Sequence, residues 1–235
     1  MKSLVFDAGP VISLTMNNLL WSLEPLRKAY GGNFYIPKAV KSELVDVPLT
    51  TKKFEFEALQ VMGEIDSGVL EVFDSQKMQE NAVFLLNLAN NCFSAKGSPI
   101  NIVHWGEMAT LATAIELGAQ ACVIDERTTR DLIERPNNIA KHMQDHLHTK
   151  VSINYSNLDA LGRHISKINV IRSVELTAVL FELGLLDRYV DKCTNKTPEL
   201  RRMLLDSVLW GVKLDGCAVS EKEIREMMKI MLGKV

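Results

Sequence analysis

Hydrophobic residues follow two alternating patterns through the first two thirds of the chain. Short apolar runs typical of buried strands are separated by stretches whose apolar residues lie three and four apart, the spacing of one helix face. The strand-like runs are residues 2–7, 33–36, 69–73, 119–124 and 151–154. Helices are predicted after Pro10 and Pro37 and over residues 54–66, 78–92, 106–118 and 130–146, the last interrupted near Pro136, with a loop at 94–99. This alternation predicts a parallel sheet covered by helices on both faces.

The pattern changes after about residue 157, where only helical spacing is found. The predicted helices there are residues 158–168, 174–183, 199–212 and 221–232. We therefore predict a three-layer α/β/α domain with a central parallel sheet over residues 1–156, followed by an all-helical C-terminal extension over residues 157–235. No Pro- or Gly-rich linker marks the boundary between the two parts.

Four carboxylates lie beside these hydrophobic segments: Asp7, Glu43, Glu107 and Asp125. Asp7 and Asp125 each follow a short apolar run directly, and an open parallel sheet collects ligands at the carboxyl ends of its strands. Carboxylates gathered there repel one another and call for a cation. An all-oxygen ligand set suits Mg²⁺ or Mn²⁺, so the chemistry indicated is phosphoryl transfer or phosphodiester hydrolysis.

Each of these acids also has an ordinary structural interpretation. Asp7 is well placed to cap the turn or helix that follows it. Glu107 lies in the first turn of its predicted helix, where an acid interacts favourably with the helix dipole. Glu43 in a helix is by itself most simply a solvated side chain. Only the four taken together favour a site.

Composition fits a soluble globular protein and restricts its setting. The 235 residues are 47% hydrophobic and 24% charged, with a net charge of −2 and a pI near 6.2. No global basic field is present, although basic residues on one face are enough to bind a nucleic acid. The four cysteines form no CxxC pair. Without a secretory signal or an apolar stretch of ~18 residues, the sequence predicts a cytoplasmic protein with no membrane partner.

The motifs around the four acids resemble those of the PIN-domain family of metal-dependent ribonucleases, which includes VapC-type toxins and many archaeal proteins. The matching segments are residues 5–10 with Asp7, 37–44 with Glu43, 106–112 with Glu107 and 123–127 with Asp125. The resemblance covers roughly residues 1–155. The third motif carries Glu where Asp is commoner in the family, and the C-terminal helices have no counterpart in the minimal toxins.

The resemblance implies a PIN-like fold and a Mg²⁺- or Mn²⁺-dependent endoribonuclease. Asp7, Glu43, Glu107 and Asp125 would be its catalytic residues and would hold one or two metal ions, directly or through water. Ser13 and Glu126 would support these ligands from a second layer, and Arg127 and Arg130 would contact RNA phosphates. The implied partners are a single-stranded RNA substrate, a second copy of the chain in a homodimer, and a protein regulator.

Several alternatives compete with this interpretation. A catalytically silent PIN-like scaffold that binds RNA or protein is the first, although all four acids are present. A haloacid-dehalogenase-type phosphatase needs a second Asp at the position of Gly9, and no GxGxxG motif or P-loop is found. His142, His146 and His148 share a segment with Asp145, yet they lack the HExxH pattern of zinc sites and favour a surface helix. Trp105 is expected to pack in the core.

Overall fold

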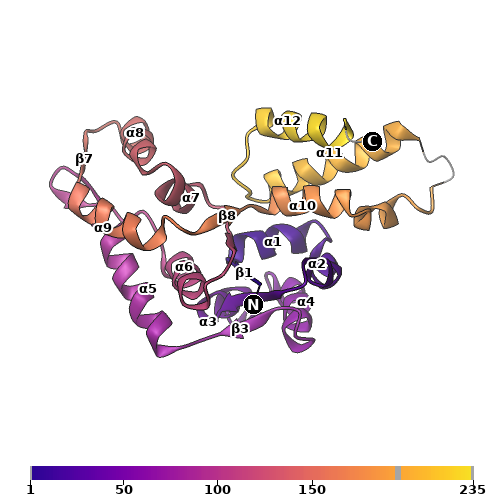
Figure 1. The fold of residues 1–235 in the computed structure, drawn as a ribbon, viewed down its shortest axis with the longest axis horizontal. Helices are drawn as coiled ribbons and strands as arrows, with labels where there is room; N and C mark the ends of the chain where they lie inside the picture. Colours follow the sequence, from indigo (N-terminus) through magenta and orange to yellow (C-terminus); the bar gives the residue numbers. More distant parts are fainter. Residues whose placement is uncertain (1, 194–196, 234–235) are drawn as a thin grey trace.

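The computed structural model describes residues 2–193 and 197–233, and its centre is a parallel five-stranded sheet (Figure 1). The strand order is β3-β2-β1-β6-β8, and every neighbouring pair is parallel. The strands are β1 (Ser3–Phe6), β2 (Asn33–Pro37), β3 (Glu71–Phe73), β6 (Ala121–Val123) and β8 (Asn169–Ile171). From β1 the sheet grows first toward β2 and β3 and then, on the other side of β1, toward β6 and β8. β1 and β6 are therefore adjacent although more than a hundred residues separate them. This is the kind of crossing point where α/β sheets place their ligands.

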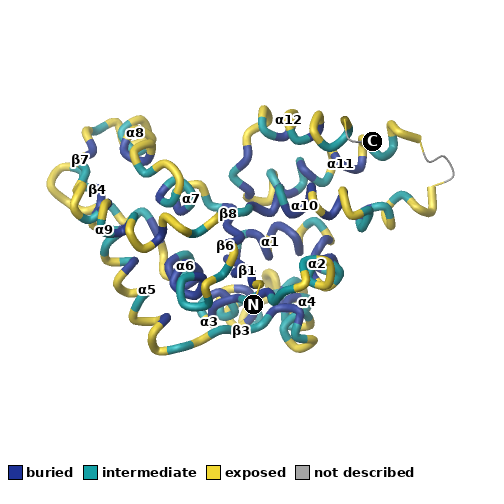
Figure 2. Tube along the Cα trace, in the orientation of Figure 1, coloured by how far each residue is buried: buried dark blue, intermediate teal, exposed yellow. Residues whose placement is uncertain are grey.

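Alternation along the central strands builds two separate cores, one on each face of the sheet. Leu4 and Phe6 of β1 face one core, and Val5 between them faces the other. Successive strand residues point to opposite faces, so a strand buried on both sides reads as a continuous apolar run. Figure 2 shows the resulting buried centre of the molecule. The expected α/β architecture, with helices on both faces of a parallel sheet, is confirmed.

The helices divide between the two faces. Those of the first core up to β8 are α1 (Ala8–Met16), the 3₁₀ turn Leu20–Ser22, α2 (Leu23–Tyr30) and α4 (Glu55–Asp66). Those of the second core are α5 (Gln76–Ala89), α6 (Trp105–Leu117), α7 (Arg127–Glu134), α8 (Pro136–Leu147) and α9 (Tyr155–Ile165). Between β2 and α4 lie α3 (Lys38–Lys41), a π-helical turn (Ser42–Asp46) and a 3₁₀ turn (Pro48–Thr50).

The C-terminal helices complete the first core instead of forming one of their own. They are α10 (Ser173–Glu182), the 3₁₀ turn Leu185–Tyr189, α11 (Pro198–Leu214) and α12 (Glu221–Leu232). Val174, Leu205 and Leu209 from these helices are fully buried in the same cluster as Leu4 and Phe6. In Figure 1 this layer lies over α1, and α10 is the helix of the layer that contacts α1.

Two details of the prediction are wrong. Residues 157–235 are not all helical, because Asn169–Ile171 form the edge strand β8 of the central sheet. The sheet therefore extends past residue 156. The segment 94–99 is not a loop but a hairpin of β4 (Phe93–Ala95) and β5 (Ser98–Pro99), which pairs with β7 (Val151–Ile153) in a small antiparallel sheet. Lys96 and Gly97 both have positive φ, as a two-residue type I′ turn requires.

Capping residues explain several of the helix boundaries. Ser75, Asn154, Thr197 and Ser220 cap the helices α5, α9, α11 and α12 through side-chain oxygens that accept backbone N–H groups. Gly118 ends α6 in a left-handed conformation with φ of 59°, as expected of a C-terminal glycine. In the described parts of the chain, no helix is long and apolar enough to cross a membrane.

Candidate active site

Asp7 and Asp125 lie side by side at the carboxyl ends of the adjacent strands β1 and β6. The Asp7 N–H donates to the Val123 carbonyl oxygen at 3.0 Å, which continues the strand pairing up to both acids. A methyl group placed on Gly9 would lie 3.5 Å from Asp125 Cβ and 3.9 Å from Asp7 Oδ2. Both side chains therefore border the same small space, and the glycine at position 9 keeps that space open.

Glu43 and Glu107 approach this place from two helical segments. Glu43 belongs to the π-helical turn Ser42–Asp46, a backbone irregularity that is frequent at functional sites. Glu107 lies in the first turn of α6, and its carboxylate accepts a hydrogen bond from the His104 N–H. A methyl group on Gly106 would lie 3.5 Å from Glu43 Oε2, so the Glu43 carboxylate sits over the start of α6 beside Glu107.

The four acids form an electrostatically strained group. Burial, and to a smaller extent the charges of Glu43 and Asp125, raises the pKa of Asp7 from 3.8 to about 6, although the N–H groups of Ala8 and Gly9 lower it. The pKa of Glu107 rises to about 7, again chiefly through burial and then through the charges of Asp7, Glu126 and Glu43. Asp7 and Glu107 therefore hold their protons more tightly than free carboxyl groups do.

Within the described parts of the chain, no basic side chain forms an ion pair with these four acids. Among the described residues, every ion pair involves acids other than Asp7, Glu43, Glu107 and Asp125. Clustered carboxylates without a cationic partner hold a high free energy in their charged forms. The site is therefore electrostatically suited to an added cation.

Asp125 differs from the other three acids because protein donors surround it. It is only 2% exposed. Oδ2 accepts hydrogen bonds from Ser13 Oγ at 2.9 Å and Ser173 Oγ at 2.7 Å, and Oδ1 accepts from the Ser173 N–H at 2.7 Å. The Cys217 thiol is a further donor to the same carboxylate. A carboxylate offers about four acceptor positions, so protein donors satisfy most of those on Asp125. Ser13, which the resemblance placed in a second layer around the ligands, hydrogen-bonds to this carboxylate.

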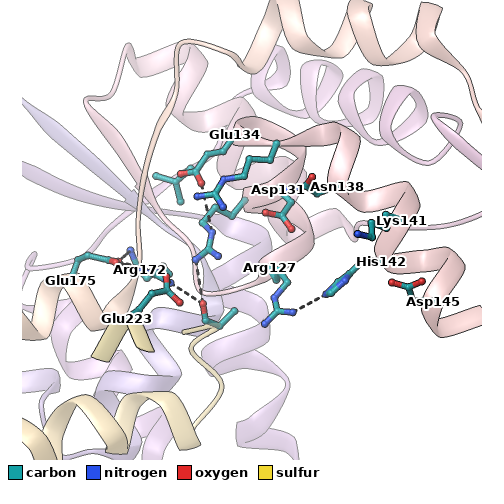
Figure 3. Close-up of a pocket in the computed structure, with 14 residues that line it drawn as sticks. Arg127, Asp131, Glu134, Asn138, Lys141, His142, Asp145, Arg172, Glu175 and Glu223 are labelled. Carbon is teal, nitrogen blue, oxygen red and sulfur yellow. Dashed lines mark hydrogen bonds and ion pairs between the residues drawn. The ribbon is translucent and has the colours of Figure 1, made fainter. Parts of the chain in front are cut away.

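The C-terminal layer is tied to Asp125 through its backbone. The Ala218 N–H donates to the Asp125 carbonyl oxygen at 3.0 Å. The Ala218 carbonyl in turn accepts from Arg172 at 2.9 Å, and Arg172 forms ion pairs with Glu175 of α10 and Glu223 of α12 (Figure 3). Because Arg172 directly precedes Ser173, this network fixes the start of α10 against the strand-end acid. The helices α10 and α12 are thus part of the site's support.

The donor chemistry of the site fits a hard divalent cation, although the side chains do not converge on one point. All four candidate ligands are carboxylates, the type that Mg²⁺ and Mn²⁺ prefer. Within residues 2–193 and 197–233, no three His, Cys, Asp or Glu side chains are close enough together to hold a metal ion as they stand. Asp7, Glu43 and Glu107 have oxygens that are not saturated by protein donors, so they are the acids free to turn toward an ion.

The remaining residues singled out from the sequence lie around this centre. Glu126 caps α7 by accepting the Thr129 N–H, and its charge acts on Glu107. Arg127 is exposed and donates to His142 Nε2 at 2.8 Å. Arg130 donates to the Ala218 carbonyl oxygen at 3.2 Å and lies 3.8 Å from Glu134.

Two expectations about neighbouring side chains have clear outcomes. Trp105 is not a core residue: it is 39% exposed and begins α6, two positions before Glu107. The three histidines His142, His146 and His148 are exposed, as expected of a surface segment.

Two side chains that contact the acids escaped the sequence interpretation. Ser173 holds Asp125 by two hydrogen bonds, and Thr110 places its hydroxyl 3.5 Å from Asp7 Oδ1. Both are polar residues that are fully buried. A fully buried hydroxyl needs a partner, so a Ser or Thr on the apolar face of a predicted helix is the available signal.

No protein-family model, curated protein or solved structure matches the chain. The fold and the site thus define an α/β protein with a carboxylate cluster at the carboxyl edge of a parallel sheet. The resemblance to the PIN-domain family stays a prediction from the motifs.

Proposed function

We propose that this protein is a PIN-like, Mg²⁺- or Mn²⁺-dependent endoribonuclease that hydrolyses phosphodiester bonds in single-stranded RNA. The observation that carries the proposal is the group of uncompensated carboxylates around Asp7, at the carboxyl ends of two adjacent central strands. This arrangement requires positive charge, and it lies where α/β sheets bind ligands.

The surroundings of each acid indicate its role. Asp7, Glu43 and Glu107 would hold the metal ion, since their carboxylates keep unsaturated oxygens. Asp125, whose carboxylate accepts from protein donors, would hold the geometry of the site. When bound, the divalent cation polarises the scissile phosphate and lowers the pKa of an attacking water. Gly9 and Gly106 leave the space between the acids free of side chains.

Exposed groups beside the acids support RNA as the substrate. Trp105 lies in the same helical turn as Glu107 and is partly exposed. An exposed indole is a group on which an unpaired base can stack. Arg127 follows Asp125 by two residues and is exposed. Its guanidinium suits a phosphate oxygen, which arginine binds with two parallel donors. The proposal also includes a homodimer and a protein regulator, because the resemblance to the PIN-domain family suggests both.

The proposal is tested by incubating purified protein with a mixed-sequence single-stranded RNA and separating the products on a denaturing gel. We expect internal cleavage with Mg²⁺ or Mn²⁺, no cleavage with EDTA, and recovery when metal is added back. Cleavage that persists in EDTA would contradict the metal mechanism. A folded protein that leaves several RNAs intact in both metals would favour a silent scaffold that binds without cutting.

A further inference from the structure

A large polar cleft lies next to the carboxylate site, between the α7–α8 pair and the start of α10 and α12 (Figure 3). Its volume is about 850 Å³. Ala218 lines this cleft, and the N–H of the same residue holds the Asp125 carbonyl oxygen. Ala218 therefore connects the cleft to Asp125, although none of the four acids lines the cleft.

A second cleft of about 560 Å³ continues the first one. The two share the lining residues Arg127, Asp131, His142 and Asp145, so they meet around the Arg127–His142 hydrogen bond. The far side of the second cleft is apolar, with Ile100, Met143 and Leu147 among its lining residues. Leu147 is 46% exposed, which leaves an apolar surface open to solvent.

The cations of the joined clefts are not equivalent. Arg172 is engaged by Glu175 and Glu223, and Arg130 lies beside Glu134. Arg135 and Lys141 line the first cleft alone, whereas Arg127 lines both clefts. Arg127 forms no ion pair with any residue the structure describes; its only side-chain hydrogen-bond partner there is His142 Nε2. A guanidinium carries five N–H donors and no acceptor, so most of the Arg127 donors stay available. Arg127 is thus a cation ready for an anion.

The residues around Arg127 suit a ligand with more than one kind of chemical group. Asp131 and Asp145 offer carboxylate acceptors on the same shared wall, and these would repel a bare phosphate. A ligand that suits the whole surface has one anionic group, N–H donors and a flat apolar part. A nucleotide has these three properties, since phosphate, base edge and base face lie within one unit.

We propose that the joined clefts bind one unpaired nucleotide of an RNA strand, beside the bond that is cut. Arg127 holds its phosphate, Asp131 accepts an N–H of its base, and the apolar wall with Leu147 receives the face of the base. The proposal rests on the proposed function for the identity of the ligand, and it adds a subsite that selects the nucleotide flanking the cleavage position.

The test measures RNA binding without cleavage, by fluorescence anisotropy of a labelled single-stranded RNA in EDTA. We expect Arg127→Gln to bind about tenfold more weakly and to lose about one unit from the slope of log affinity against log salt concentration. Leu147→Ser, at an exposed position, is expected to weaken binding about fivefold through the lost contact with the base. The control is Arg163→Gln on α9, which removes the same charge from an exposed arginine outside both clefts.

The outcomes separate this inference from the nuclease proposal. Binding by Arg127→Gln equal to that of wild type, or reduced no more than in Arg163→Gln, would overturn it. Loss in Arg127→Gln with none in Leu147→Ser would reduce the site to a phosphate contact and contradict the base subsite. Displacement of the RNA by an equal concentration of free nucleoside monophosphate would assign the cleft to a free nucleotide instead. RNA binding that depends on both residues in a protein that never cuts would uphold the subsite while the nuclease proposal fails.

Discussion

Asp7→Asn is expected to lower metal-dependent RNA cleavage about a thousandfold while making the metal-free protein more stable at pH 8. Replacing the central ligand removes the group that the other acids surround, so activity falls toward background. The same change removes a buried negative charge that has no cationic partner. Loss of activity with a gain in stability is typical of a functional residue whose charge destabilises the fold. Removing a helix cap would instead lower the stability.

The sign of the stability effect follows from the raised pKa of Asp7. Its folded-state pKa of about 6 exceeds the ordinary 3.8, so the folded protein binds this proton more tightly than the unfolded chain. Stability of the wild type without metal therefore falls as pH rises from about 4 to about 6, and the full penalty, up to about 3 kcal/mol, is present above that range. Asparagine has no such penalty. The melting temperature of the Asp7→Asn variant at pH 8 should exceed that of wild type by several degrees.

The measurement is thermal unfolding in EDTA at pH 5 and pH 8, beside the cleavage assay with Mn²⁺. Asp159→Asn, at an exposed position on α9, is the matched control and should follow wild type in both. A variant of Asp7 that loses stability at pH 8 would identify this residue as a structural cap.

Asp125→Ala is expected to destabilise the protein by about 4 kcal/mol, the reverse of the effect at Asp7. The substitution leaves Ser13 Oγ and both donors of Ser173 without their acceptor, and both serines are fully buried. Each unsatisfied buried donor costs about 1–3 kcal/mol, and the lost side chain adds a cavity. The change also frees the start of α10 from β6.

Asp125→Asn separates the role of the hydrogen bonds from that of the charge. The amide oxygen can accept the Ser173 N–H, and the amide nitrogen can donate to the serine hydroxyls, which rotate to accept. We expect a loss of only about 1 kcal/mol, together with reduced cleavage. Urea unfolding at pH 7.5 distinguishes the two variants. Equal stability of Asp125→Ala and wild type would contradict the network described around this residue.

These opposite expectations show how far the sequence alone leads. Asp7 and Asp125 look alike in the sequence, since each follows a short buried strand, and their position at one sheet edge was predictable from that pattern. Their difference depends on Ser13 and Ser173, which lie 112 and 48 residues from Asp125 along the chain. Contacts of such separation are fixed by the tertiary packing of α1 and α10 and leave no local signal.

The elements that were misread are those with the shortest patterns. β8 has three residues, too few to show alternation, and it owes its strand conformation to pairing with β6. The hairpin at 93–99 is built from a three-residue and a two-residue strand around Lys96-Gly97. The long amphipathic helices were predictable within a few residues because their apolar spacing repeats over several turns. The joined clefts were not, because they lie between helices that only the tertiary fold brings together.

The central claim is that the carboxylates around Asp7 bind a divalent cation, and calorimetric titration of Mn²⁺ into the metal-free protein tests it most directly. We expect a saturable binding isotherm for wild type and for Asp159→Asn, and none for Asp7→Asn, whose fold is checked by its melting temperature. An absence of binding to folded wild type, or equal binding to Asp7→Asn, would contradict the claim.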